Sequence, residues 1–333
     1  MTTIYDIAKK TGFSITTVSK VLNNYSDVGA KTRKKILDAV NEMDYYPSSS
    51  ARSLTTKKSW SIGVVYVEQL GMEHPFFNAV IESFKNSMEK SGYDLLFASN
   101  KIGNDMKTYL DHFQYRGVDG VVIVCSALKD SHVERLIRST IPSVVIDFDS
   151  RETCVVYSDN EYGCELAVNH LYSLGHRKIA HISGDQELFP GVTRLEGFIR
   201  AMQKHKLSIS DGFIADGGYF SYEGGRAAMR KLLLQDEKPT AVFVAGDLMA
   251  LGAIAEIRDH GLNVPDDISV IGFDDIKMIQ YTEPALTTIR QETSILGKTA
   301  ANLLLDQIND KEKQSLAVKI PVKLIERKSC RPI

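Results

Sequence analysis

The sequence predicts an α/β fold in which a small helical head precedes a body of two doubly wound parallel sheets. Three observations support this prediction. Apolar residues recur at helical spacing over the first 45 residues, short apolar runs alternate with helical patterns from residue 61 on, and this alternation restarts after Tyr157. A chain of 333 residues with 43% hydrophobic content is long enough to form two or three domains with buried cores.

Two capped helices and a tight turn are predicted at the start of the chain, in IYDIAKKTGFSITTVSKVLN. Thr3, followed three residues later by Asp6, is a helix-start signal. Gly12 is suited to end that helix in a left-handed conformation, and Ser14 can cap the second helix. The second helix has one apolar face, made of Val18, Val21 and Leu22. Its opposite face carries side chains able to touch base edges and phosphates, namely Ile15, Thr16, Ser19, Lys20 and Asn23.

A third helix is predicted over residues 30–44, with an apolar side made of Ile36, Leu37, Val40 and Met43. Its first turn is basic, although cations at a helix N-terminus oppose the macrodipole, and a nearby polyanion would explain them. Residues 1–60 contain ten Lys and Arg against five Asp and Glu, a net charge of +5, whereas the remainder carries −7. A basic head on an acidic body is typical of a nucleic-acid-binding module attached to another domain.

The body is predicted to consist of two similar halves that face each other across a cleft. In the first half the predicted strands are 62–67, 94–98, 118–124 and 143–147, and the predicted helices are 76–91, 105–116 and 130–139. In the second half the strands are 178–182, 213–215, 241–245 and 268–272, and the helices are 160–174, 222–234 and 248–260. The chain recrosses near 287–290, and a last helix at 293–309 precedes one or two terminal strands.

Open parallel sheets bind ligands at the carboxyl ends of their strands, so the residues that follow the strands form the candidate ligand site. Aromatic rings, carboxylates and one guanidinium occur there. The candidates are Phe76, Phe77, Asp147, Arg194, Phe220, Asp247 and Asp274. This set suits a polyhydroxylated ring, because the aromatic faces stack on C–H groups while hydroxyls donate to acids and accept from Arg. Asp247 is equally suited to cap a helix, and Asp275 is expected to fix loop backbone.

The head, continued by AKTRKKILDAVNEMDYYPSSSARSLTTKKSWSIGVV, resembles the LacI/GalR family of bacterial transcriptional repressors in spacing and residue type. The resemblance implies that the DNA major groove is read by Ser14, Ile15, Thr16, Ser19 and Lys20. It implies that the DNA backbone is positioned by Tyr5, Thr17, Asn23 and Thr32. Ala51 and Leu54 match the family's hinge helix, whose leucine is driven between central base pairs through the minor groove. The alternative for Leu54 is a linker residue that packs on the body.

The resemblance also implies a body like a type I periplasmic sugar-binding protein. The expected domains are a helix-turn-helix head at 1–46, a hinge helix and linker at 47–60, and an effector-binding and dimerisation body at 61–333. The two subdomains of the body would be 61–158 with 290–318, and 159–289 with 319–333. The expected protein is a cytoplasmic homodimer that binds a double-stranded DNA operator and responds to a small-molecule effector, a sugar or sugar derivative. Whether the effector induces or co-represses is left open.

Two departures from the family are visible. Gly246 stands where many relatives have an asparagine before the aspartate, and the chain ends without the leucine-heptad extension that makes some members tetrameric. Because of the first departure, one side chain that would hydrogen-bond a sugar hydroxyl is missing, or another residue of the chain supplies that contact. The second leads us to expect a dimer.

Other classes of function fit the sequence less well. An enzyme is disfavoured because Asp274 and Asp275 are neighbours on a turn, which cannot converge as acid and base, and no nucleotide-binding or nucleophile motif occurs. A sugar-binding receptor without a DNA function would have to be exported, and it would not carry a basic helical head. A purine-responsive repressor or a catabolite-control regulator of the same family stays an alternative. No cofactor, metal or membrane partner is expected, because the four cysteines lack C-x-x-C spacing, the histidines form no metal motif and no run of about 18 apolar residues occurs.

Overall fold

The computed structural model describes residues 2–23, 25–46, 58–66, 73–97, 108–124, 126–310 and 315–333, with the backbone of 101–102 and 105–106. The chain divides into two compact units. One unit holds residues 1–60 with 117–119 and contains the head, and the other is the body. The predicted hinge helix, with Ala51 and Leu54, lies outside the described residues.

The head contains three helices, α1 (Ile4–Thr11), α2 (Ile15–Leu22) and α3 (Ala30–Glu42). The predicted start and end signals are confirmed. The backbone N–H of Thr3 donates to the Asp6 carboxylate at 2.9 Å, and Gly12 ends α1 with a φ of 75°. The Ser14 hydroxyl caps α2 by accepting from the Thr17 N–H at 3.1 Å.

A small apolar core holds these helices together. Ile7, Val18 and Ile36 are fully buried in it, one from each helix. The expectation that Leu37 joins this core is wrong, since Leu37 is 40% exposed and Ala39 is buried instead. Successive helical residues lie 100° apart, so the stripe that begins at Ile36 continues three and four residues later and leaves Leu37 beside it.

The first lobe of the body is built on a six-stranded sheet in the order β13-β7-β6-β5-β1-β2, with all neighbours parallel. Its strands are β1 (Ser61–Tyr66), β2 (Asp94–Phe97), β5 (Gly120–Val124), β6 (Ser143–Ile146), β7 (Cys154–Ser158) and β13 (Ala317–Ile320). Its helices are α5 (Pro75–Lys90), α6 (Tyr109–Arg116), α7 (Ser131–Ile137) and α12 (Thr293–Asn309). The central strands β5 and β6 are buried along their whole length, as expected for a parallel sheet covered on both faces.

The second lobe is built on a six-stranded sheet in the order β14-β12-β11-β10-β8-β9, in which only the β12–β14 pair is antiparallel. Its strands are β8 (Ile179–Ser183), β9 (Ile214–Asp216), β10 (Ala241–Val244), β11 (Ser269–Asp274), β12 (Thr287–Arg290) and β14 (Lys323–Ile325). Its helices are α8 (Asn160–Ser173), α9 (Phe189–Lys204), α10 (Tyr222–Leu233), α11 (Asp247–Asp259) and the 3₁₀ helix η2 (Lys277–Tyr281). Helix α8 packs on α9 and α10 packs on α11.

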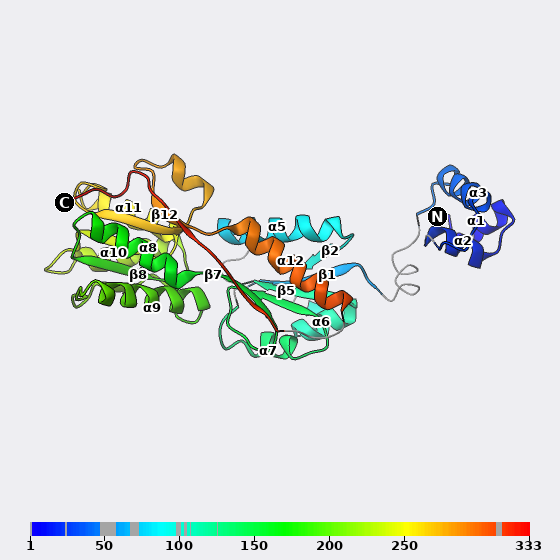
Figure 1. Cartoon of the computed structure of the whole chain (residues 1–333), viewed down its shortest axis with the longest axis horizontal. Helices are drawn as coiled ribbons and strands as arrows, with labels where there is room; N and C mark the ends of the chain where they lie inside the picture. Colours follow the sequence, from blue (N-terminus) through cyan, green and yellow to red (C-terminus); the bar gives the residue numbers. More distant parts are fainter. Residues whose placement is uncertain are drawn as a thin grey trace. The chain divides into compact units, whose positions relative to one another are not determined.

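The chain passes between the two lobes three times. It leaves β7 for α8, returns from β12 to α12, and leaves β13 for β14, the last crossing being the red segment in Figure 1. The alternation of strands and helices that the sequence predicts is therefore present in both lobes, and the predicted α/β fold class is confirmed.

Two elements of the first lobe differ from the prediction. The helix expected over 105–116 begins at Tyr109, because Thr108 and Asp111 form a reciprocal cap at that point. Residues 105–106 instead form the strand β4 (Asp105–Met106), which pairs with β3 (Lys101–Ile102). Strand β7 was not predicted from the sequence, although its residues Val155 and Val156 are buried in the sheet.

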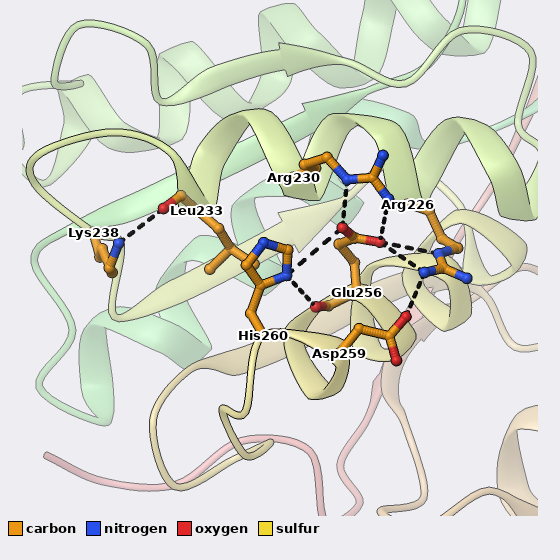
Figure 2. A network of polar contacts seen from close by, with 7 residues as sticks. All are labelled: Arg226, Arg230, Leu233, Lys238, Glu256, Asp259 and His260. Carbon is orange, nitrogen blue, oxygen red and sulfur yellow. Dashed lines mark hydrogen bonds and ion pairs between the residues drawn. The ribbon is translucent and has the colours of Figure 1, made fainter.

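A buried carboxylate joins α10 to α11 on the second lobe (Figure 2). The Glu256 side chain on α11 is only 1% exposed, and it accepts hydrogen bonds from Arg226 and Arg230 on α10. Arg226 also pairs with Asp259, and the His260 ring faces Glu256. The hydrogen bonds from Arg230 and Arg226 hold the pKa of Glu256 below its usual value. The network joins two helices whose N-terminal ends are next to candidate residues in the chain, because Phe220 precedes α10 and Asp247 begins α11.

Candidate nucleic-acid interface and effector site

Helix α2 exposes the side chains that are expected to read DNA. Ser14, Ile15 and Thr16 are exposed around its N-terminus, while Ser19 and Lys20 are half-buried one turn on. Val18 and Val21 lie on the opposite side, in the core of the head. The structure thus separates the predicted reading face from the apolar face, as a helix that enters the major groove requires.

The residues expected to contact the DNA backbone come from all three helices of the head, and their exposure differs. Tyr5 is 67% exposed, whereas Thr17, Asn23 and Thr32 are half-buried. The Asn23 side-chain amide donates to the carbonyl of Ser19 at 2.9 Å, and Lys20 pairs with Asp27. Lys20 and Asn23 therefore have partners inside the head that a DNA contact would have to replace or share.

Arg194, on α9, is the central side chain of the candidate effector site. It is 2% exposed, and its Nε donates to the Asn160 side-chain oxygen at 2.8 Å while its Nη1 donates to the carbonyl of Ala245 at 2.6 Å. Nη1 also lies 3.5 Å from the Asp274 carboxylate, and the guanidinium stacks 3.8 Å from the centre of the Phe273 ring. A charge buried this deeply is held in one orientation by contacts on every side.

Asp147 follows β6 and is completely buried in the first lobe. Neither of its carboxylate oxygens accepts a hydrogen bond from any residue that the structure describes. The Ser158 amide faces the carboxylate without reaching hydrogen-bond geometry. Burial raises the pKa of Asp147 to about 6, even though the nearby Arg194 charge acts in the opposite direction. An unpaired buried carboxylate is costly, and it is therefore a strong indication of a ligand contact.

Asp274 ends β11 in the second lobe and faces the same guanidinium. Its Oδ1 accepts from the Gln291 side chain at 2.6 Å. Burial raises the pKa of Asp274 to about 6, offset in part by Arg194. The charge of Asp147 also acts on it, so the two carboxyls lie near each other although they come from different lobes.

The aromatic candidates Phe76, Phe77 and Phe220 are all nearly buried. Phe76 and Phe77 begin α5 and meet edge to face, with centroids 5.3 Å apart. The Phe220 ring occupies the space beside Gly184, where an added Cβ would lie 2.2 Å from the ring, and beside Gly246 at 3.1 Å. A side chain at position 246 would therefore require the Phe220 ring to shift slightly.

Three of the candidates have strained backbone. Asp147, Phe220 and Asp274 have φ values of 55°, 43° and 122°, a region that side chains rarely adopt. Such strain persists only where the surrounding structure enforces it, and it concentrates at functional sites.

Asp247 is placed differently from the expectation. It is the first residue of α11 rather than its cap, and its carboxylate accepts from the Thr288 hydroxyl at 2.6 Å and from the backbone N–H of Ile276 at 2.9 Å. Both oxygens are thus engaged within the second lobe, and burial raises the pKa of Asp247 well above its usual value. Asp275 likewise pairs with the side chains of Arg290 and Arg327, rather than with the loop backbone.

Sequence reasoning missed three residues of this region. His74, which caps α5, is 4% exposed, and neither ring nitrogen has a partner among the described residues. The Asn160 side-chain nitrogen and the Gln291 side-chain oxygen are also buried, and neither has a hydrogen-bond partner among the described residues. For His74 a signal existed, because a polar residue directly before Pro75 at the end of a strand-to-helix loop lies where ligands bind.

A cavity of about 450 Å³ borders this site and is lined from both lobes, with Phe76 on one side and Asp274 and Gln291 on the other. This volume is within the range of small-molecule pockets, roughly 300–1,000 Å³. Among the described residues, no three side chains come together as a metal site. In the same part of the chain, none of the helices has both the length and the apolar character that a bilayer crossing needs.

A helix-turn-helix head joined to a two-lobed body with a polar interlobe site defines a DNA-binding protein with a binding-protein-like body. Residues 3–48 match the family described as bacterial regulatory proteins, lacI family, and residues 168–330 match the periplasmic binding protein-like domain. The chain is 37% identical to the HTH-type transcriptional repressor PurR of Pasteurella multocida, over 99% of each chain. The chain therefore belongs to the lacI family, as predicted, and is a DNA-binding transcriptional repressor rather than an enzyme.

Solved structures agree with this assignment. The chain superimposes on a Lac repressor dimer bound to operator and the anti-inducer ONPF with a TM-score of 0.87, at 29% identity over 99% of each chain. It also superimposes on a LacI family regulator from Enterococcus faecium with bound ribose, with a TM-score of 0.70 and 31% identity over 82% of this chain and 99% of that one.

Proposed function

We propose that the repressor binds a pseudo-palindromic operator as a homodimer, and that a sugar or sugar derivative in the interlobe site controls its operator affinity. The proposed targets are carbohydrate-utilisation genes. The observation that carries the effector role is the fully buried Asp147 carboxylate, which has no hydrogen-bond donor among the described residues and faces the Arg194 guanidinium of the other lobe.

Control of this kind requires that the effector bind one arrangement of the lobes more tightly than another. The site meets that requirement because its groups are divided between the lobes. Asp147 comes from the first lobe, whereas Arg194 and Asp274 come from the second. A ligand that contacts both sets of groups would favour the arrangement in which they lie close together. By the likeness to the Lac repressor dimer, such a change would be passed to paired heads on DNA.

The sugar proposal and a purine alternative rest on different observations. The Enterococcus faecium regulator holds ribose, and the paired carboxylates beside aromatic rings suit a polyol. The PurR repressors among the relatives favour a purine as the second candidate.

Operator recognition can be tested by selection of duplexes from a random pool with the full chain, followed by measurement of affinity. We expect a pseudo-palindromic site, and we expect Thr16→Ala to change the selected bases while Thr193→Ala, in the body, leaves them unchanged. Recovery of no sequence above the background pool would contradict the proposal. An unchanged selection by Thr16→Ala would contradict the role of α2.

A further inference from the structure

We propose that Asp27, in the loop between α2 and α3, sets the base specificity of the head by controlling Lys20. Asp27 holds the Lys20 ammonium at the reading face of α2 and offsets its attraction to DNA phosphates. This inference rests on the proposed operator recognition by α2. It starts from the ion pair between the Lys20 ammonium and the Asp27 carboxylate. Lys20 is the only charged residue among the five that are predicted to read DNA, so its partner decides how that charge is used.

The loop that carries Asp27 is attached to both neighbouring helices. The backbone N–H of Tyr25 donates to the carbonyl of Lys20 at 3.0 Å. The carbonyl of Tyr25 accepts from the side chain of Arg33 on α3. Val28, the residue after Asp27, packs against the apolar core of the head. Asp27 therefore lies between two anchored residues, and its carboxylate is held beside the last turn of α2.

An ammonium group can bind a carboxylate and a base edge at the same time. It has three N–H donors, and its hydrogen bond to Asp27 uses one of them. The remaining donors are suited to the O6 and N7 acceptors of a guanine in the major groove. A lysine has a flexible four-carbon stem, so an ion pair formed before DNA arrives reduces the conformational freedom that the base contact has to remove. Asp27 is thus a positioning residue for Lys20.

The negative charge of Asp27 has a second effect, on phosphates. Sequence-independent DNA binding comes mainly from cations that neutralise phosphates. The hydrogen bond from Lys20 lowers the pKa of Asp27, so the carboxylate is ionised near pH 7 and balances the Lys20 charge. Specificity is a difference between affinities, so a group that weakens binding to arbitrary DNA raises the preference for the operator.

Direct base reading by Asp27 is a different role and is disfavoured. A carboxylate can accept from the N4 amino group of cytosine. In this head, however, the Asp27 carboxylate is already engaged by Lys20, and the charge of Arg33 also acts on it. The two roles predict different results, because direct reading by Asp27 would not require Lys20.

The head contains a second ion pair that serves as a matched control. Lys10 on α1 pairs with Glu42 on α3 at 2.6 Å. The Lys10 and Lys20 side chains are both 42% exposed, and the carboxylates of both pairs are exposed. Glu42→Gln therefore changes the net charge of the head by the same amount as Asp27→Asn, but leaves the partner of Lys20 in place. Exposed ion pairs contribute little to stability, so both variants should fold, which melting curves check.

The test uses the full chain. Duplexes are selected from a random pool by wild type, Lys20→Met, Asp27→Asn, Asp27→Glu, Glu42→Gln and the double variant of Lys20→Met with Asp27→Asn. The positions at which Lys20→Met loses its base preference identify the Lys20 contact. Fluorescence anisotropy then gives the Kd of each protein for the selected operator and for a scrambled duplex of the same length, over a series of salt concentrations.

We expect Asp27→Asn to bind the scrambled duplex roughly three- to tenfold more tightly than wild type, with a log–log salt slope steeper by about 0.9, the effect of about one more neutralised phosphate. It should also relax the base preference at the positions that depend on Lys20. Asp27→Glu, which keeps the charge, should stay close to wild type, and Glu42→Gln should select the same bases as wild type. Once Lys20 is Met, the further change at Asp27 should not alter the selected bases.

The inference is overturned if Asp27→Asn selects and discriminates as wild type does, or if Lys20→Met changes no base preference. It is also overturned if Glu42→Gln reproduces the effect of Asp27→Asn, because the total charge of the head would then be the cause. A change confined to positions that do not depend on Lys20 would show direct reading by Asp27 and would overturn it as well. Selection of no sequence by wild type would overturn the proposed function too, whereas a selected operator with unchanged Asp27 variants would overturn the inference alone.

Discussion

Burial of the Asp147 carboxylate is expected to destabilise the effector-free body, and we propose that the residue is retained for binding. A carboxyl pKa raised from 3.8 to about 6 corresponds to a cost on the order of 3 kcal/mol when the group is ionised. Because the folded pKa is the higher one, this group favours folding below pH 3.8 and loses that advantage as the pH rises to about 6. We predict that Asp147→Asn raises the melting temperature of the effector-free protein at pH 7 and abolishes stabilisation by effector. Calorimetry checks both effects, and a lower melting temperature would contradict the assignment.

Effector binding should also depend on pH. The ligand's hydroxyls would donate to the ionised forms of Asp147 and Asp274, whose pKa values are both raised to about 6 by burial. Affinity should therefore be constant above about pH 7 and fall as the pH drops through 6. His74 does not titrate in this range, because its pKa is lowered to about 4. Isothermal titration between pH 5 and 8 measures this, and an affinity that rises at low pH would argue against carboxylate acceptors.

At the level of single residues, the sequence indicated the charged groups of the site better than their roles. Asp147, Arg194 and Asp274 were found because they follow strands or loops at one edge of a parallel sheet, where position alone is informative. Asp247 satisfies the same rule, yet Thr288 and Ile276, which are far away in sequence, engage its carboxylate. His74 was missed although its position directly before Pro75, at the end of a strand-to-helix loop, is where ligands bind.

At the level of elements, the α10–α11 network of Figure 2 should stabilise the second lobe. Glu256→Ala leaves Arg226 and Arg230 without their shared buried acceptor, so we predict a melting temperature lower by several degrees. The pKa of Glu256 is lowered, so its contribution is present above about pH 4.5 and is lost as the pH falls. Asp259→Ala removes only an exposed partner of Arg226 and should change the melting temperature little. Equal effects of the two variants would show that burial of Glu256 is unimportant.

The elements that were predicted well are those whose signal is local. The apolar runs of β5 and β6 and the capped helices of the head needed no tertiary information. The start of α6 was misplaced because the predicted helix was extended back to residue 105, although Thr108 and Asp111 have the same spacing as the cap at Thr3 and Asp6. Leu37 was misassigned because it directly follows the buried Ile36 in the chain. A step of one residue turns a side chain by about 100° around the helix axis, which places Leu37 on the exposed side.

For the whole molecule, the central claim is that occupancy of the interlobe site sets operator affinity. The claim can be tested because the residues proposed to read DNA lie on α2 in the head, whereas the effector candidates lie in the body. Each set can therefore be substituted without changing the other. Arg194→Ala should remove the effector response, while Arg200→Ala, on the exposed side of the same helix, should keep it.

The most direct measurement is the Kd of the full chain for its selected operator, determined by fluorescence anisotropy with and without saturating effector. For wild type and Arg200→Ala, the Kd should change by at least about fivefold, which corresponds to a coupling free energy of roughly 1 kcal/mol. For Arg194→Ala it should not change. An operator Kd that stays the same in wild type, while calorimetry shows the ligand bound in the site, would contradict the claim.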